Sequence, residues 1–334
     1  MSHPRSAFGA SPSSGRRWRT GKAGSAAAAW PELLRDDAAL AAGLAALCAR
    51  HGLAGLPVRR YDSGSLPVYA IGAGHVLKLF PPHEESHASV EARVLVALHA
   101  ALPIPTPRLL GVERVNGWHC VLMSQLRGQR AVDVWPALPA TARDRLADAL
   151  GAGVAALHAL DTTALADLTP RWEDFLPAQL ASAVERQRAH GLDAYWLERL
   201  PEFLHAWMPP PDARRSLLHT ELMREHLMLE EGRDGWQWSG LFDFEPAMVG
   251  APEYELASLG IFVACGDGRF LRRALLAYGY HADALGPPLQ CRLMAYTLLH
   301  RYSNLPWYLE RLPADAAVTL EALAARWWPL SSHP

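Results

Sequence analysis

The sequence predicts an α+β fold in which a small antiparallel sheet carrying one helix precedes a larger, mostly helical lobe. Short strand-like runs separated by turn residues occupy residues 56–126, whereas apolar residues recur at helical spacing through most of the later chain. The length of 334 residues also exceeds what one hydrophobic core usually serves. We therefore expect a disordered basic tail (1–31), an N-terminal lobe (32–125) and a C-terminal helical lobe (126–334).

The first 31 residues are rich in Ser, Gly, Ala and Arg, with five basic residues and no acidic one. Such a segment buries too little apolar surface to order itself, so we interpret it as a disordered tail, with an electrostatic anchor as the alternative. A stripe of leucines then predicts a helix over about residues 31–51.

Three strands are predicted next, over residues 58–61, 68–71 and 76–80, the last stopped by two prolines. The loop over residues 62–67 joins the first two strands and contains Ser65. Its flexible backbone and its hydroxyl groups suit a loop that covers phosphates, and an ordinary turn is the alternative. A helix over about 86–101 follows, and Asn116-Gly117 then predicts a hairpin between strands 109–115 and 118–123.

Lys78 lies within the third strand, and it is one of only two lysines, with Lys22, among 32 basic residues. A compact ammonium group in an apolar strand is either a functional point charge or a surface residue with a buried stem. Glu91 lies at the edge of the apolar face of the following helix, from which its side chain can point toward Lys78; a solvated helix position is the alternative.

Acidic residues are concentrated between His219 and Gly260, where nine Asp or Glu face two Arg. An apolar run delivers Glu221 to a loop, and a second strand brings Asp243 back beside it. The negative electrostatic field of these acidic residues suits a divalent cation or a cationic substrate. A hairpin with a solvated acidic loop is the alternative. A lysine, a helix glutamate and a late carboxylate, in this order, are typical of phosphoryl transfer.

Helical spacing marks the rest of the chain. We expect helices over about 141–160, 256–263, 271–278, 291–302 and 318–328. Glu253, Glu255 and Asp267 are acidic residues that would suit a polycationic sugar, although solvated helix ends explain them equally well.

The sequence resembles the aminoglycoside phosphotransferases, which are protein-kinase-like small-molecule kinases, and within them most of all a hygromycin phosphotransferase. The resemblance covers about residues 56–313. It is densest at Val76-Leu-Lys-Leu-Phe80, Ile104-Pro-Thr-Pro-Arg-Leu-Leu-Gly111, Val121-Leu-Met-Ser-Gln-Leu-Arg-Gly128, Leu157-His-Ala-Leu160 and residues 219–256.

This resemblance implies a protein-kinase-like two-lobed fold that binds ATP and Mg²⁺. Lys78 would contact the phosphates, Glu91 would orient Lys78, and Ser65 would lie in the loop that covers the phosphates. Backbone groups near Ser124 and Leu126 would pair with adenine. In the same way, Glu221 would be the catalytic carboxylate, and Asp243 would hold the metal.

Three departures from the family pattern concern the catalytic loop, which usually reads His-Gly-Asp-Leu followed four residues later by a metal-binding Asn. Here the loop reads His219-Thr-Glu-Leu222, and His226 occupies the Asn position. Glutamate is longer than aspartate by one methylene, and imidazole suits manganese or zinc better than magnesium. Ala251 also replaces a common Asp of the family.

Composition excludes several other classes. The net charge of −2 gives no basic surface for nucleic acid, and no apolar run reaches the length of a membrane span. Four scattered cysteines indicate neither a disulfide framework nor a zinc ribbon, which favours the cytoplasm. His83-Glu-Glu-Ser-His87 matches the zinc-protease motif, but the two preceding prolines place it in a loop or at a helix start.

The sequence therefore predicts an ATP-dependent phosphotransferase acting on a hydroxyl of a small molecule, with an aminoglycoside or related amino-sugar as the leading substrate class. The alternative is a catalytically degenerate nucleotide-binding protein with a regulatory role, because Glu221 and His226 replace the usual residues. We expect a monomer or homodimer with a small hydroxylated substrate and no nucleic-acid or membrane partner.

Overall fold

The computed structural model describes residues 37–115, 117–208, 214–313 and 319–330. The chain divides into two compact units, residues 1–42 and residues 43–334. Of the first unit only residues 37–42 are described, as the beginning of helix α2 (Asp37–Arg50). The predicted basic tail (1–31) lies outside the described residues, and so do the first residues of the predicted leading helix.

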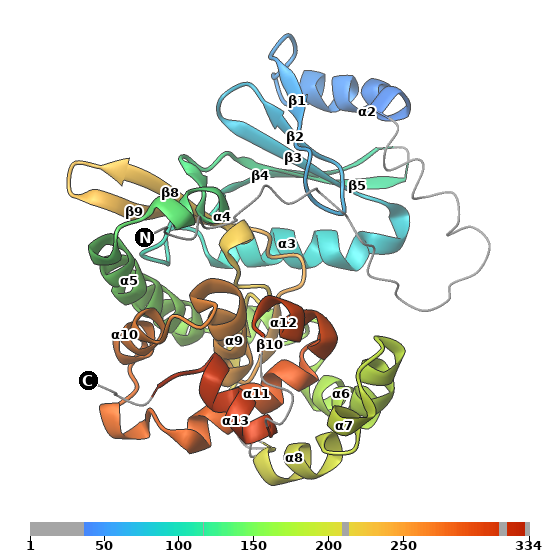
Figure 1. Cartoon of the computed structure of the whole chain (residues 1–334). Coiled ribbons are helices and arrows are strands. Elements are labelled where there is room, and N and C mark those ends of the chain that lie inside the picture. Colours follow the sequence, from blue (N-terminus) through green and yellow to red (C-terminus); the bar gives the residue numbers. More distant parts are fainter. Residues whose placement is uncertain (1–36, 116, 209–213, 314–318, 331–334) are drawn as a thin grey trace, which may run out of the picture. The chain divides into compact units, whose positions relative to one another are not determined.

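The second unit begins with a five-stranded antiparallel sheet in the order β1-β2-β3-β5-β4 (Figure 1). Its strands are β1 (Val58–Arg60), β2 (Val68–Ile71), β3 (His75–Phe80), β4 (Leu109–Val115) and β5 (Trp118–Ser124). The predicted strands are therefore confirmed to within one residue. The predicted hairpin is also confirmed, because Val115 pairs with Trp118 across the turn.

Helix α3 (Glu85–Ala97) packs against strands β3, β4 and β5 of this sheet (Figure 1). Its buried side chains recur at helical spacing and include Val90, Val94 and Leu95, as the apolar pattern predicts. Glu91 is buried among them, so this helix carries one carboxylate into an otherwise apolar interface.

The remainder of the unit is mostly helical, as predicted, with two small sheets. The helices are α4 (Ala131–Val134), α5 (Ala140–Ala159), α6 (Trp172–Ala189), α7 (Ala194–Leu197), α8 (Leu200–Trp207), α9 (Pro252–Ser258), α10 (Gly268–Tyr278), α11 (Pro287–Leu299), α12 (Leu305–Arg311) and α13 (Leu320–Trp327). The strands are β6 (Gln129–Arg130), β7 (Ser216–Leu218), β8 (Leu227–Gly232), β9 (Gly235–Leu241) and β10 (Met248–Gly250).

One predicted helix differs in the structure. The segment expected as a single helix over 256–263 is the end of α9 followed by a π-helix, η5 (Leu259–Ala264). Gly260 is its second residue, and a Cβ there would lie 2.1 Å from the indole nitrogen of Trp328. The close approach of Trp328 therefore requires a glycine at this position, which sequence periodicity does not reveal.

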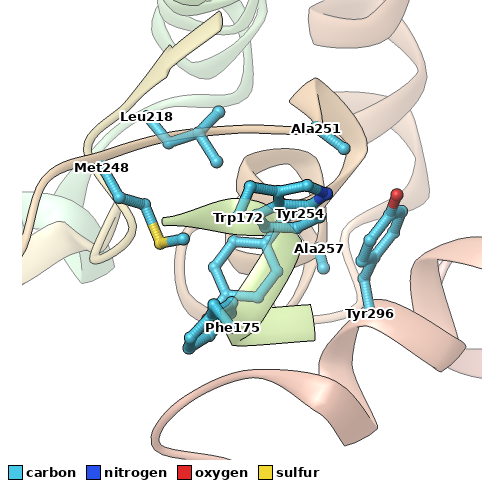
Figure 2. Packing of buried hydrophobic residues seen from close by; sticks show 8 residues of the cluster. All are labelled: Trp172, Phe175, Leu218, Met248, Ala251, Tyr254, Ala257 and Tyr296. Carbon is cyan, nitrogen blue, oxygen red and sulfur yellow. The ribbon is translucent and has the colours of Figure 1, made fainter. Parts of the chain in front are cut away.

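An aromatic cluster packs beneath strands β7 and β10, which pair antiparallel with Met248 opposite Leu218 (Figure 2). Trp172 and Phe175 of α6 contact Tyr254 of α9 edge-to-face, with ring centroids 5.5 and 5.7 Å apart. Because Leu218 directly precedes the predicted catalytic loop, this cluster fixes the point from which that loop departs.

Candidate active site

Lys78 is the centre of the candidate site. It lies on β3 opposite Val121 of β5, and only 6% of its surface is exposed. Its Nζ donates to Glu91 Oε2 at 2.7 Å, so the predicted contact between these two side chains is confirmed. Glu91 Oε1 also accepts the backbone N–H of Phe244 at 3.4 Å, and Glu91 therefore joins the sheet to the segment that contains Asp243.

Asp243 and Glu245 complete a group of three carboxylates around this ammonium group. Asp243 forms an ion pair with Lys78, and Glu245 Oε2 lies 2.5 Å from Lys78 Nζ. Burial opposes the charge of Lys78, but the three carboxylates outweigh it and raise its pKa well above the usual value. Burial raises the pKa of Glu245 to about 7, although Lys78 acts in the opposite direction.

The predicted catalytic loop begins at His219, which is fully buried. Its Nδ1 accepts the backbone N–H of Glu221 at 3.2 Å, so its Nε2 carries the proton and donates to the carbonyl of Phe242 at 2.7 Å. Burial lowers the pKa of His219 to about 3, which keeps the ring neutral in this arrangement. His219 therefore ties the loop to the backbone of Phe242, which directly precedes Asp243.

Thr220 has a left-handed backbone conformation with φ of 70°, which a β-branched residue rarely adopts. Its hydroxyl donates to the carbonyl of Pro246 at 3.0 Å, and its own carbonyl accepts from His300 Nε2 at 2.8 Å. The family pattern that the sequence resembles has glycine at this position, and in this protein two hydrogen bonds support the threonine.

Glu255 supports the loop from beneath and has no exposed surface. Its Oε2 accepts the backbone N–H groups of His219 and Thr220, the latter at 3.0 Å. Burial raises the pKa of Glu255 to about 7. Of the acids that were candidates for a polycationic sugar, Glu255 therefore has a structural role instead.

The other two of those acids are also engaged. Glu253 forms a bidentate pair with Arg292, with Oε1 at 2.8 Å and Oε2 at 2.9 Å, and accepts from the hydroxyl of Tyr280 at 3.1 Å. Asp267 caps helix α10 by accepting the backbone N–H of Phe270 at 3.0 Å. Glu253 and Glu255 are therefore not simply solvated residues at a helix end, because both carboxylates form hydrogen bonds within the protein.

Glu221 and His226 lie close to Asp243 and form a second group of possible metal ligands. His226 Nδ1 contacts the carbonyl of Glu221 at 3.0 Å and therefore carries a proton, which directs its Nε2 toward Asp243 Oδ2, 3.2 Å away. Burial raises the pKa of the Glu221 carboxyl. No hydrogen bond of that carboxylate to another described side chain is found.

The side chains around Lys78 fit a divalent cation. When Glu91, Asp243 and Glu245 are ionised, three negative charges face one ammonium group, which leaves two negative charges uncompensated. In the described parts of the chain, ligand atoms of Glu221, His226 and Asp243 lie within 4.8 Å of one another, as do those of Glu91, Asp243 and Glu245. Oxygen donors dominate both sets, as Mg²⁺ and Mn²⁺ prefer.

Comparison with known families decides the identity of the fold. The model of the phosphotransferase enzyme family matches residues 57–288 of this chain, which is well over half of its length. The chain belongs to this family. A comparison with curated protein sequences gives no significant match.

Solved structures of other phosphotransferases share the fold. The GDP complex of wild-type aminoglycoside 2'-phosphotransferase-IIIa is 19% identical with a TM-score of 0.66, covering 85% of this chain and 97% of that one. The streptomycin–ATP complex of APH(2")-IIa is 16% identical (TM-score 0.55; 83% and 97% covered). Macrolide 2'-phosphotransferase MphH from Brachybacterium faecium is 24% identical (TM-score 0.55; 87% and 99% covered).

In the segment after β5, where adenine contacts are predicted near Ser124 and Leu126, one backbone N–H is already bonded within the protein. The backbone N–H of Ser124 donates to the carbonyl of Arg108 at 2.9 Å, so this N–H is not available to a ligand. Among the described residues the N–H of Leu126 donates to no backbone carbonyl. The Leu126 side chain packs on β9, where a Cβ on Gly240 would lie 2.4 Å from it.

Ser65 is exposed in the loop between β1 and β2, and no hydrogen bond of its side chain to the Lys78 group is found in the described chain. The neighbouring Ser63 does reach the rest of the unit, because its hydroxyl accepts from Arg130 Nη1 at 3.2 Å. The structure therefore brings Lys78, Glu91, Glu221, His226 and Asp243 together, whereas no hydrogen bond joins Ser65 to them among the described residues.

The zinc-protease motif lies where the chain enters helix α3. Its first histidine lies in the short 3₁₀ helix η1 (Pro82–Glu84), and His87 lies in the first turn of α3. Glu84 pairs with His87, and among the described residues neither histidine belongs to a group of three ligands. The expected position at a helix start is confirmed.

Several residues of the site were missed from the sequence. Glu245 was signalled only by its spacing of two from Asp243. His300 lies 80 residues from the Thr220 carbonyl that it contacts, and no local pattern links the two.

In the described chain no helix is both long and apolar enough to cross a membrane, and all four cysteines are free thiols.

Proposed function

We propose that this protein transfers the terminal phosphate of ATP to a hydroxyl of a small molecule. One observation carries the proposal: Lys78 Nζ is held by Glu91 at 2.7 Å and contacts Asp243, while Glu221 and His226 lie on the opposite side of Asp243. Catalysis of phosphoryl transfer rests on positioning and electrostatic stabilisation, and these are the charges that it requires.

Each residue has a role in this proposal. Lys78 neutralises phosphate oxygens and Glu91 orients it. Asp243 and His226 hold Mg²⁺ or Mn²⁺, which when bound neutralises charge on the phosphates. Glu221 aligns the acceptor hydroxyl and accepts its proton, and the raised pKa of its carboxyl suits a base.

The protein would bind the nucleotide at its adenine base and at its phosphates. The carbonyl of Ser124 and the N–H of Leu126 pair with adenine, and the loop that contains Ser65 closes over the phosphates. Because Lys78 is paired with three carboxylates, phosphate oxygens must replace at least one of these pairs when the nucleotide binds.

The resemblance favours an aminoglycoside as acceptor, with hygromycin-like compounds first, which would make the protein an antibiotic-resistance enzyme. Structural neighbours include complexes with streptomycin and with gentamicin. We place the reaction in the cytoplasm, with a small molecule as the only partner and a monomer or homodimer as the active form. In the proposed division the N-terminal lobe ends near residue 125.

A regulatory nucleotide-binding protein is the second candidate. It is favoured by the combination of Thr220 with φ of 70°, Glu221 in place of the catalytic Asp, and His226 in place of the metal-binding Asn. Such a protein would bind nucleotide with metal and transfer no phosphate.

Thermal shift and ATP consumption separate the two candidates. Stabilisation by ATP with Mg²⁺ or Mn²⁺ is expected for both, whereas acceptor-dependent ATP consumption is expected only for the enzyme. Glu221→Gln should lower kcat by about 10²- to 10⁴-fold without weakening nucleotide binding, and the exposed neighbour Glu225→Gln serves as the control. Binding without turnover over a broad panel of hydroxylated acceptors would contradict the enzyme.

A further inference from the structure

Arg224 lies between the two unusual side chains of the predicted catalytic loop, three residues after Glu221 and two before His226. It begins the short 3₁₀ helix η4 (Arg224–His226). Within this segment His226 Nδ1 contacts the carbonyl of Glu221 at 3.0 Å, and the His226 backbone N–H donates to the carbonyl of Met223 at 3.0 Å. Both contacts are local, so they fix the shape of the segment but not its place in the protein.

The side chain of Arg224 joins this segment to a distant helix. Its Nε donates to the carbonyl of Val263 at 2.8 Å, and its Nη2 donates to the carbonyl of Ala264 at 3.5 Å. Val263 and Ala264 are the last residues of the π-helix η5, and the last carbonyls of a helix lack partners within the helix. Arg224 therefore supplies donors to the end of η5 from 39 positions away in the sequence.

A tryptophan packs against the same guanidinium group. The central carbon of the Arg224 guanidinium lies 4.2 Å from the ring centre of Trp135, which is within the range of a cation–π contact. Trp135 is buried, and it packs in turn against Trp238 of β9 and Phe270 of α10, with ring centroids 6.2 and 5.2 Å apart. Helix carbonyls and a fixed aromatic ring therefore both hold the Arg224 side chain.

The charge of Arg224 has the wrong sign to attract a metal ion. Glu221, His226 and Asp243 form one of the groups that could hold a cation, and a guanidinium beside them repels that cation. The two hydrogen bonds of Arg224 are with neutral carbonyl oxygens, which leave its charge in place. An arginine here can favour metal binding only by fixing where the ligands lie.

From these contacts, and resting on the proposed function, we propose that Arg224 is a positioning residue for the metal site. It anchors η4 to the end of η5 and to Trp135, and this anchor places Glu221 and His226 around the metal. The glutamate and histidine differ in length from the Asp and Asn of the family pattern, so the backbone between them must be placed to suit. Arg224 is thus a second external anchor of the loop, after the hydrogen bonds to Thr220.

The test uses two variants of the full-length protein. Arg224→Met keeps a long stem against Trp135 but removes the donors and the charge, whereas Arg224→Lys keeps the charge without the planar fork. Electron paramagnetic resonance follows the titration of Mn²⁺ in the presence of a non-hydrolysable ATP analogue. Electron spin echo modulation then reports whether an imidazole nitrogen coordinates the bound Mn²⁺.

The matched control is Arg143→Gln, because Arg143 contacts the same tryptophan but not η5. Its guanidinium carbon lies 5.9 Å from the ring centre of Trp135, and its Nη2 donates to the Trp135 carbonyl at 3.1 Å. Urea unfolding of each variant separates a general loss of stability from an effect on the metal site.

We expect Arg224→Met to weaken Mn²⁺ binding by about 10- to 100-fold, as for the loss of other outer-shell partners, and to diminish the nitrogen modulation. Binding of the nucleotide without metal should be nearly unchanged. Arg224→Lys should lie between wild type and Arg224→Met, and Arg143→Gln should match wild type in Mn²⁺ affinity. The sign is decisive, since removal of a positive charge alone would strengthen Mn²⁺ binding.

Several results would overturn this inference. Equal or tighter Mn²⁺ binding by Arg224→Met is one, and an equal loss in Arg143→Gln is another, because it would assign the effect to the packing of Trp135. A wild-type protein that binds Mn²⁺ with nucleotide but gives no nitrogen modulation would also contradict it. If Arg224→Met does not fold, Arg224→Lys carries the same comparison. Failure of wild type to bind nucleotide with metal would instead contradict the proposed function itself.

Discussion

The buried carboxylate of Glu255 accepts the backbone N–H of Thr220 at 3.0 Å, so a glutamate on α9 holds the strained residue that precedes Glu221. The two residues are 35 positions apart in the sequence. Together with the bond from His300 to the Thr220 carbonyl, this contact fixes the peptide planes on both sides of Thr220. The direction of the Glu221 side chain therefore depends on residues outside the loop.

The conformation of Thr220 predicts an unusual order of stability. Both Thr220→Gly and Thr220→Ala lose the hydrogen bond to Pro246, but only glycine adopts positive φ without strain. We expect the glycine variant to be more stable than the alanine variant by about 1–2 kcal/mol. Urea unfolding measures the difference.

The control for this comparison is Ala178→Gly at an exposed position inside α6, where glycine should instead be less stable than alanine by about 1 kcal/mol. Equal stability of the two Thr220 variants would show that the backbone is not strained at this residue.

Glu255 predicts a pH dependence of stability. Burial raises the pKa of Glu255 to about 7 from an ordinary value of 4.5, so the folded state binds more protons than the unfolded state between these values. Its contribution is fully present below about pH 4.5 and is lost as the pH rises through about 7.

We therefore expect the unfolding free energy of wild type, relative to Glu255→Gln, to fall by on the order of 1–3 kcal/mol between about pH 5 and about pH 8. Denaturant titrations at several pH values measure it, with the exposed Glu310→Gln as control. A difference that stays constant with pH, or that grows as the pH rises, would contradict the raised pKa.

Lys78 predicts a coupled loss of binding and stability. Lys78→Met leaves three carboxylates without their ammonium partner, so we expect a loss of about 3–5 kcal/mol in unfolding free energy, as for a broken buried ion pair. Nucleotide affinity should also fall, because the phosphates lose a positive charge. Urea unfolding and titration with a fluorescent ATP analogue measure the two effects.

The double variant Lys78→Met, Glu91→Gln separates them. Removal of the uncompensated charge on Glu91 should restore part of the stability but none of the nucleotide affinity. If the double variant were less stable than the single one, the charge of Glu91 would not be the source of the destabilisation.

His226 predicts the choice of metal. Imidazole nitrogen favours Mn²⁺ or Zn²⁺ over Mg²⁺, whereas an amide oxygen suits Mg²⁺. We expect His226→Asn to shift the ratio of Mn²⁺ to Mg²⁺ affinity toward Mg²⁺ by about tenfold or more, on the scale of altered ligand environments. Electron paramagnetic resonance of bound Mn²⁺, with Mg²⁺ as competitor, measures the ratio without turnover.

The surface residue His205 of α8 provides the control, since His205→Asn should leave the ratio unchanged. An unchanged ratio in His226→Asn as well would exclude His226 from the metal site.

Local patterns in the sequence were sufficient for most of the fold. Alternating apolar residues and turn signals placed β1 to β5 to within one residue, and helical spacing placed α3 and α5. These patterns work because each strand or helix buries one face with a fixed period. The π-helix η5 was missed, since it depends on the packing of Trp328 against Gly260, 68 positions apart.

The candidate site divides in the same way. The sequence alone determined the order of Lys78, Glu91, Glu221 and Asp243 and the family that this order resembles. Only the tertiary structure decided that Glu255 and His300 hold the predicted catalytic loop, and that the Ser124 N–H is already bonded. Periodicity along the chain reports which face of an element is buried. It carries no information on which distant side chains meet there.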